Sequence, residues 1–273
     1  MNKSMHPAPT GVGESIRRAN TEGRCAFIPY ITVGAPTLEV SLAVIQCLEE
    51  LGADVIELGV PFSDPVADGP TIQRSSERAL AEGVTLRRVL EEFSRRPEPR
   101  GGARLLFSYF NPILQYGIAA LPAALRDAGI GAVLISDLIP EEAAQWLAVA
   151  RENAIECSFL AAITSDPERL KRVAAASSAF IYCISTTGVT GARETVDGAA
   201  LRTVRSLRGM SDLPVAVGFG IRSTIDVRRL ATVADAVVVG SALIDAIGDT
   251  DNPGVACGRA TAFALPLLEA CRR

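Results

Sequence analysis

Short runs of β-branched and apolar residues alternate with longer segments whose apolar residues recur every three to four positions. The short runs predict β-strands, and the longer segments predict helices with one buried face. Eight strands are predicted, over residues 25–33, 54–60, 104–110, 132–138, 156–163, 179–185, 214–219 and 236–240. Helical patterns between them cover, among others, residues 38–51, 85–96, 141–154, 201–209 and 224–234.

Eight β–α repeats in about 250 residues are typical of a (β/α)8 TIM barrel, an α/β fold. An open, doubly wound parallel sheet is the alternative. Because no linker divides the chain, we expect a single catalytic barrel over residues 14–273, preceded by a flexible tail over residues 1–13. Two connections, residues 61–83 and 186–198, are longer than a minimal repeat needs. Both follow the carboxyl ends of predicted strands, where a barrel carries its active-site loops.

Composition narrows the choice of ligand. The 273 residues are 48% hydrophobic and carry a formal net charge of −4, which disfavours nucleic acid and anionic membrane surfaces as partners. The chain shows neither an apolar stretch of about 18 residues nor the apolar core of a signal peptide. We therefore expect a cytoplasmic protein that binds a small molecule.

Histidine, lysine and cysteine usage excludes several kinds of chemistry. The single histidine, His6, lies in the predicted tail, which argues against a histidine base, a Ser-His-Asp triad or a His-ligated metal. The two lysines are Lys3 in the tail and Lys171 on a predicted helix, so neither is placed to form a Schiff base. The six cysteines contain no C-x-x-C pair, and we expect neither a zinc site nor a disulfide framework.

Two carboxylates are candidates for acid–base chemistry. Glu57 lies inside the apolar run 55–60, where one strand face points into a barrel. Burial of a carboxylate raises its pKa, as a general acid near neutral pH requires, although an ion pair with an arginine in the barrel is the alternative. Asp68 follows in a loop that Pro61, Pro65 and Pro70 stiffen over the barrel mouth. The alternative for Asp68 is a turn residue or the N-cap of the helix beginning near residue 71.

Glycines at the ends of the seventh and eighth strands predict a phosphate site. Gly220 and the pair Gly240-Ser241 each precede a helical pattern, in the position where barrels commonly bind phosphate. Plain turn glycines are the alternative. The small, polar segment 188–193 has the composition of a lid that orders over a ligand, although an inert loop has the same composition.

Five runs of residues resemble the alpha subunit of tryptophan synthase. They are FIPYITVG (27–34), ELGVPFSDPVADGP (57–70), YFNP (109–112), GVTGAR (188–193) and GFG (218–220), and the resemblance extends from about residue 14 to the C-terminus. It implies a barrel that cleaves indole-3-glycerol phosphate to indole and glyceraldehyde 3-phosphate in a retro-aldol step, as a lyase of tryptophan biosynthesis.

The resemblance also implies a role for individual residues. Glu57, Asp68 and Tyr182 match the catalytic positions. The phosphate site is matched by Gly191, Gly220, Gly240 and Ser241, the lid by Thr190, and the indole pocket by Tyr30, Phe107, Leu134 and Phe219. Asp64 falls where the family contacts its partner.

That partner is the beta subunit, which holds pyridoxal phosphate and receives indole through a tunnel, in an alpha2-beta2 tetramer. The resemblance thus implies a chain without a cofactor or a metal of its own. A stand-alone lyase that releases free indole has the same catalytic residues and stays an alternative. A barrel without catalysis that activates a partner is a further alternative, and the presence of both Glu57 and Asp68 argues against it.

Overall fold

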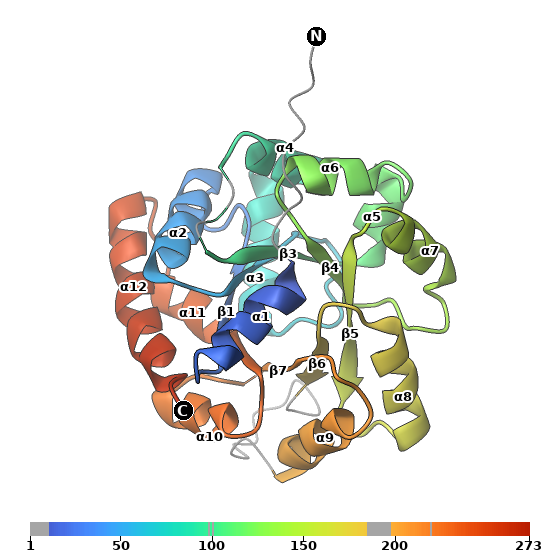
Figure 1. Cartoon of the computed structure of the whole chain (residues 1–273). Coiled ribbons are helices and arrows are strands. Elements are labelled where there is room, and N and C mark those ends of the chain that lie inside the picture. Colours follow the sequence, from blue (N-terminus) through green and yellow to red (C-terminus); the bar gives the residue numbers. More distant parts are fainter. Residues whose placement is uncertain (1–10, 98, 100, 185–197, 219) are drawn as a thin grey trace.

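The computed structural model describes residues 11–97, 99, 101–184, 198–218 and 220–273. Its strands form a closed, fully parallel barrel in the order β1 to β8, with β1 paired to β8 (Figure 1). The strands are β1 (Ala26–Thr32), β2 (Val55–Gly59), β3 (Ala103–Ser108), β4 (Ala132–Ile135), β5 (Glu156–Ala162), β6 (Ile181–Ile184), β7 (Val215–Gly218) and β8 (Ala236–Val239). The predicted TIM barrel is confirmed, and the open sheet is wrong.

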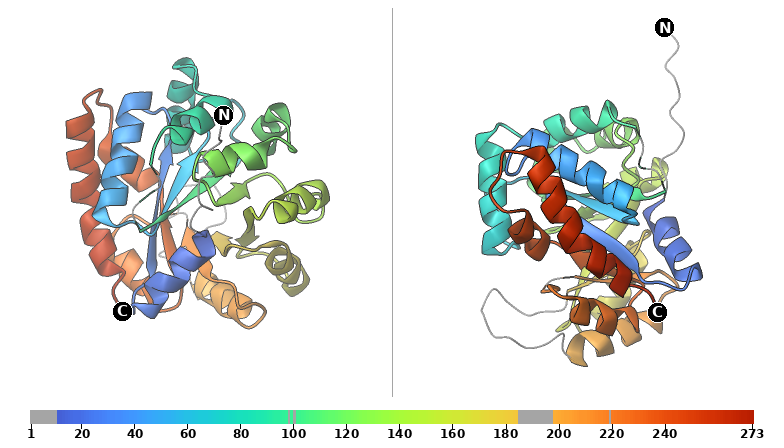
Figure 2. Two further views of the ribbon diagram at one scale, coloured as in Figure 1. Left: turned by 45° about the horizontal axis from the view of Figure 1, so that its top comes forward. Right: turned by 90° about the vertical axis from the view of Figure 1, so that its left-hand side faces the viewer.

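Helices surround the barrel on its outside, apart from α1, which covers one end (Figure 2). They are α1 (Val12–Thr21), α2 (Leu38–Leu51), α3 (Pro70–Ala81), α4 (Leu86–Ser94), α5 (Phe110–Tyr116), α6 (Leu121–Asp127), α7 (Ala144–Glu152), α8 (Pro167–Ala176), α9 (Gly198–Arg208), α10 (Thr224–Ala231), α11 (Ser241–Ile247) and α12 (Pro253–Ala270). None of the helices described is long and apolar enough to cross a bilayer.

Strand alternation divides the core into two layers. Residues such as Ile28 and Leu105 fill the barrel interior, whereas their neighbours Phe27 and Leu106 pack outward against the helices. This two-sided burial explains why the strands read as continuous apolar runs in the sequence. A buried polar side chain on the inward face, such as Glu57, therefore stands out against an apolar background.

α1 closes the amino-terminal end of the barrel and lies across its centre in Figure 1. The Val12 N–H donates a 2.6 Å hydrogen bond to Glu156, the first residue of β5. Val12 and Gly13 are helical and buried. The flexible tail was predicted to end at residue 13, but Val12 and Gly13 already belong to α1, the helix that closes the barrel.

All eight predicted strands are present, with differences at their ends. The third was predicted to run to residue 110, but β3 ends at Ser108 and Phe110 begins α5. The apolar run continues beyond the strand because Tyr109 is buried under the loop that follows β2, not because it pairs in the sheet. The helix predicted over residues 38–51 is observed with those bounds, since the Thr37 side chain caps its start and Gly52, at φ 98°, ends it.

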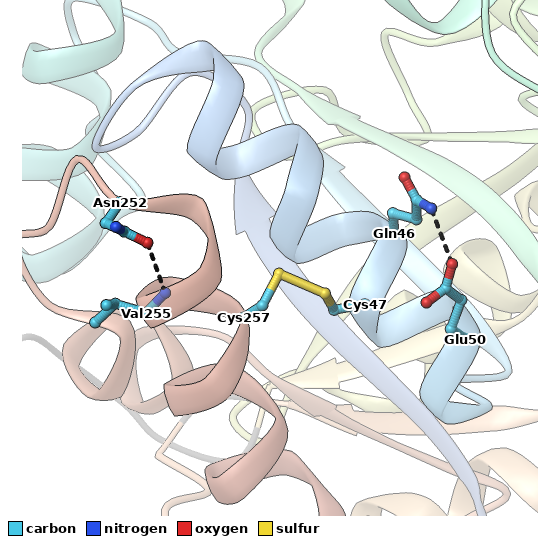
Figure 3. The surroundings of a disulfide bond; sticks show 6 residues. All are labelled: Gln46, Cys47, Glu50, Asn252, Val255 and Cys257. Carbon is cyan, nitrogen blue, oxygen red and sulfur yellow. Dashed lines mark hydrogen bonds between the residues drawn. A yellow bond between two sulfur atoms is a disulfide. The ribbon is translucent and has the colours of Figure 1, made fainter.

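The sequence predicted no disulfide framework, but one pair of cysteines is bonded. Cys47 of α2 and Cys257 of α12 are bonded, with their Cα atoms 6.0 Å apart (Figure 3). The two helices lie side by side in Figures 1 and 2 because closure of the barrel brings the start and the end of the chain together. The other four cysteines, Cys25, Cys157, Cys183 and Cys271, are buried free thiols.

Candidate active site

The carboxyl ends of the strands surround a cavity of about 200 Å³. The base of the cavity is determined by the strand register. Glu57 on β2 is the direct neighbour of Tyr30 on β1 and of Leu105 on β3. The lining residues are Tyr30, Glu57, Asp68, Gly69, Pro70, Thr71, Ile72, Phe107, Tyr182, Gly220, Ile221, Arg222, Val238, Gly240 and Ser241. Predicted residues from four strands, β1, β2, β3 and β6, thus meet predicted residues from the segments that follow β2, β7 and β8.

A larger cavity of about 260 Å³ lies between α3 and α11, outside β1. Its charged lining is partly paired, since Arg78 forms an ion pair with Asp249, and Thr71 donates a 2.9 Å hydrogen bond to Asp245. It contains neither Glu57 nor Asp68. The barrel cavity is therefore the better candidate, although it is smaller.

Glu57 is 1% exposed and projects into the cavity. Burial, and next the nearby charge of Asp68, raises the pKa of Glu57 to about 8. Its Oε1 has no hydrogen-bond partner, and no ion pair involves Glu57 in the described part of the chain. The structural ion pair considered as an alternative is therefore wrong, and the carboxyl group is free to meet a ligand.

Asp68 is 8% exposed, at the end of the loop that joins β2 to α3. Burial raises the pKa of Asp68 to about 6, and a hydrogen bond from Tyr109 opposes this rise. The Asp68 side chain does not cap α3, because Gly69 occupies the N-cap position. The alternative hypothesis that Asp68 is the N-cap of this helix is therefore wrong. Instead its backbone carbonyl accepts a 2.8 Å hydrogen bond from Gln73.

Tyr109 holds the β2–α3 loop in place through its hydroxyl and its ring. Its hydroxyl donates a 3.1 Å hydrogen bond to Asp68 Oδ2 and accepts one of 3.0 Å from the Ala67 N–H. Its ring packs on Phe62 of the same loop, with centroids 5.0 Å apart. Sequence reasoning did not assign a role to Tyr109, although it lies in the YFNP run that carries part of the resemblance.

Aromatic side chains form the walls beside the carboxylates. The Tyr30 and Phe107 rings meet edge to face at 5.6 Å, and Tyr182 comes from β6 on the opposite side. Burial raises the pKa values of Tyr30 and Tyr182 well above normal, so both keep neutral hydroxyls. Each hydroxyl lies over a glycine, Tyr30 over Gly59 and Tyr182 over Gly218, where a Cβ atom would overlap it.

The ends of β7 and β8 supply the opposite side of the cavity. Gly220 has a φ of +79°, a left-handed conformation that favours glycine. Gly240 and Ser241 come from the start of α11. This side offers mostly backbone groups and small side chains, as a phosphate cradle does.

Three predicted residues lie outside the described residues: Thr190, Gly191 and Phe219. Leu134 belongs to the barrel interior but does not line the cavity. Asp64 is exposed on the β2–α3 loop, away from the cavity, and accepts a hydrogen bond from Ser63. Arg222 lines the cavity and was not predicted. The described residues contain no cluster of histidine, cysteine, aspartate or glutamate suited to hold a metal ion.

Comparisons with known proteins agree on one family. The sequence profile described as "Tryptophan synthase alpha chain" matches residues 16–268. The tryptophan synthase alpha chain of Acidithiobacillus ferrooxidans is 45% identical over 253 residues, 92% of this chain and 92% of the relative. That of Mycobacterium marinum is 43% identical over 241 residues, 87% of this chain and 88% of the relative.

Solved structures give the same result. A chain of Mycobacterium tuberculosis tryptophan synthase has a TM-score of 0.87 at 38% identity, covering 98% of this chain and 100% of that chain. The tryptophan synthase alpha subunit of Legionella pneumophila has a TM-score of 0.85 at 29% identity, covering 96% of this chain and 98% of that chain. Because the match spans the whole barrel and the strands that build the cavity, this chain belongs to the tryptophan synthase alpha chain family.

Proposed function

We propose that this chain is a lyase that cleaves indole-3-glycerol phosphate to indole and glyceraldehyde 3-phosphate. The observation that carries the proposal is the pair Glu57 and Asp68, two buried carboxyl groups with different pKa values in one cavity. At neutral pH a pKa of about 8 leaves Glu57 mostly protonated, whereas a pKa of about 6 leaves Asp68 mostly ionised. One cavity thus holds an acid and an anion together.

Glu57 is the acid–base group of the reaction. Its protonated form donates a proton to C3 of the indole ring, which makes the bond between C3 and the glycerol chain breakable. The resulting carboxylate then accepts the proton of the hydroxyl on the adjacent carbon. That carbon becomes the aldehyde, the C3–carbon bond breaks, and its electron pair returns to the ring, so that Glu57 regains its proton.

Asp68 stabilises the charge that this step creates. Protonation of C3 places a positive charge on the ring nitrogen, and an ionised carboxylate that accepts the ring N–H stabilises it. Tyr30 and Phe107 form the walls for the indole ring, with Leu134 in the interior layer and Phe219 assigned from the family pattern. Tyr182 lies beside Glu57, and we assign it to orient that carboxyl group.

We assign the substrate phosphate to the glycine side of the cavity. Gly220, Gly240 and Ser241 line this side, and the family pattern adds Gly191. The same pattern assigns Thr190 to the lid, facing Asp68. In this assignment the indole ring lies against Tyr30 and Phe107, and the phosphate lies at the ends of β7 and β8.

The test is Glu57→Gln. This change keeps the shape of the side chain and removes its titrating proton, so cleavage should fall at least ~100-fold, as for loss of a general acid–base group. Binding of indole, measured by titration, should change little. Glu49→Gln is a matched control, because Glu49 pairs with Arg104 on the outside of the barrel. Near-normal turnover by the Glu57 variant would remove this residue from the mechanism.

We further propose that the chain acts in the cytoplasm with a tryptophan synthase beta subunit, in an alpha2-beta2 tetramer, and that this partner holds the pyridoxal phosphate. Asp64 and Val66 are both exposed on the β2–α3 loop, Val66 to 81%, and this exposure supports the loop as the partner-facing surface. Purified beta subunit should raise turnover of indole-3-glycerol phosphate, and Asp64→Ala should reduce this stimulation. Unchanged turnover upon addition of beta subunit would instead favour a stand-alone lyase.

A further inference from the structure

We propose that Arg222 recognises the phosphate group of the substrate and makes the site selective for a doubly charged phosphate ester over an uncharged ligand. The inference rests on the proposed function and adds a residue to it. Arg222 follows Gly220 closely in the loop between β7 and α10 and lines the cavity at its glycine side.

The charges around the cavity are unbalanced without Arg222. Glu57 and Asp68 are the two acidic lining residues, and among the described lining residues Arg222 alone is basic. A phosphate dianion entering this cavity meets one carboxylate that is ionised at neutral pH and another that ionises at higher pH. Because Glu57 and Asp68 are buried, their charges are poorly screened by solvent, and a cation at the cavity edge offsets their repulsion of the phosphate.

The backbone at the start of α10 is already occupied by a carboxylate. Asp226 Oδ2 accepts hydrogen bonds from the Arg222 N–H at 3.2 Å, the Ser223 N–H at 3.0 Å and the Ser223 hydroxyl at 2.8 Å. The Ser223 N–H, at the N-cap of α10, is one of the donors that a helix start normally offers to a phosphate. Because Asp226 occupies this donor, the loop presents one free donor fewer and an added negative charge, which a side-chain cation offsets.

The Arg222 side chain is available for this task. It is exposed, and its guanidinium forms neither a hydrogen bond nor an ion pair with any residue that the structure describes. A planar guanidinium donates two parallel hydrogen bonds to phosphate oxygens, which neutral glycine and serine groups cannot match in charge. Arg222 thus complements the backbone cradle with charge.

The experiment compares Arg222→Gln, Arg222→Lys and a control, Arg228→Gln. Arg228 is also exposed and unpaired among the described residues, but it lies on α10 away from the cavity. The capping of α10 uses the Arg222 backbone, so the Gln variant retains it. Steady-state kinetics with indole-3-glycerol phosphate give KM and kcat. Calorimetric titration with glycerol 3-phosphate and with indole gives the two affinities separately.

Arg222→Gln should raise KM and weaken glycerol 3-phosphate binding by at least about tenfold, the effect of losing one charge-assisted hydrogen bond. Binding of indole should change less than about twofold, and kcat should stay near that of the wild type. Arg222→Lys should recover part of the loss, and the KM of the wild type should rise more steeply with salt than that of the Gln variant. Arg228→Gln should match the wild type.

Unchanged KM and unchanged glycerol 3-phosphate affinity in Arg222→Gln would overturn the proposal, and so would equal weakening of glycerol 3-phosphate and indole. Either result would leave the proposed function standing, provided that the wild type cleaves indole-3-glycerol phosphate. Failure of the proposed function has a different signature, since the wild type itself would then show no cleavage. Circular dichroism and melting of each variant verify that the fold is retained.

Discussion

Glu57 and Asp68 show how two residues of similar chemistry receive different properties from their surroundings. Glu57 lies on a strand in the barrel interior, and burial without a hydrogen bond to Oε1 raises its pKa to about 8. Asp68 lies on a loop near the mouth, where Tyr109 donates a hydrogen bond to it and its pKa rises only to about 6. The division of labour between acid and anion is thus a property of environment, not of residue type.

These pKa values predict the pH dependence of the reaction. Activity requires ionised Asp68, so it falls as pH decreases through about 6. Activity also requires protonated Glu57, so it falls as pH increases through about 8. We therefore expect a bell-shaped profile of kcat/KM with a maximum near pH 7.

Tyr109→Phe should shift the acidic limb of the pH profile of kcat/KM. Loss of the Tyr109 hydroxyl removes the hydrogen bond that lowers the pKa of Asp68, so the acidic limb should move to higher pH. The other ionisable groups around Asp68, which are Glu57, Tyr30, Tyr182 and Arg222, are unchanged, so the alkaline limb should remain in place. At neutral pH kcat/KM should fall about tenfold, since a hydrogen bond to a charged group is lost.

Tyr116→Phe is the matched control for this change. Tyr116 does not line the cavity. Its ring packs against Arg87, with the guanidinium carbon 5.0 Å from the ring centroid. Its profile should coincide with that of the wild type. If both limbs move together in Tyr109→Phe, the hydroxyl acts on the whole loop and not on the proton of Asp68.

At the scale of single elements, strand alternation explains which site residues could be predicted from the sequence and which could not. Glu57 was identifiable because one acidic residue interrupted an apolar strand whose inward face was predictable. Tyr109 and Arg222 were not, because both lie just beyond strand ends, where alternation gives no information about direction. Whether a loop residue points toward the mouth depends on contacts such as the Ala67–Tyr109 hydrogen bond, which no local pattern encodes.

Glycines on the strands leave room for the tyrosine hydroxyls, and Gly218→Ala should demonstrate this. The new Cβ atom would overlap the hydroxyl of Tyr182, which is buried and has little freedom to move. We expect a loss of about 1–3 kcal/mol in the free energy of unfolding, together with a lower kcat/KM. Urea denaturation and steady-state kinetics measure the two effects.

Gly258→Ala is the corresponding control. Gly258 lies inside α12, where a Cβ atom meets nothing within 4 Å. Alanine should therefore stabilise the helix by about 0.5–1 kcal/mol and leave the activity unchanged. A normal kcat/KM and stability in Gly218→Ala would show that Tyr182 adapts without cost.

At the scale of the whole molecule, the repeat of strands and helices predicted the barrel, whereas the Cys47–Cys257 bond could not be predicted. The two cysteines are 210 residues apart and belong to no recognisable spacing motif. Their proximity follows only from closure of the barrel, which pairs β1 with β8 and packs α12 on α2. Global closure was predictable, but the facing positions on two surface helices were not.

Reduction of the disulfide should destabilise the protein. In the chain-entropy account, a crosslink between distant residues lowers the entropy of the unfolded chain, so reductant should lower the free energy of unfolding by about 3–5 kcal/mol. The Cys47→Ser/Cys257→Ser double variant should unfold at the same urea concentration with and without reductant. Catalytic turnover should be alike in both forms, since the bond joins helices outside the barrel. An unfolding midpoint of the wild type that is insensitive to reductant would contradict this prediction.

The same bond changes what a protease can do to the molecule. Cys47 and Cys257 close a covalent ring that contains β2 to β8 and most of the cavity residues. A single backbone cut anywhere inside this ring leaves both fragments attached to each other. A nicked molecule therefore cannot lose either half by dissociation, and it migrates as one species in denaturing gels until a thiol reagent separates its pieces.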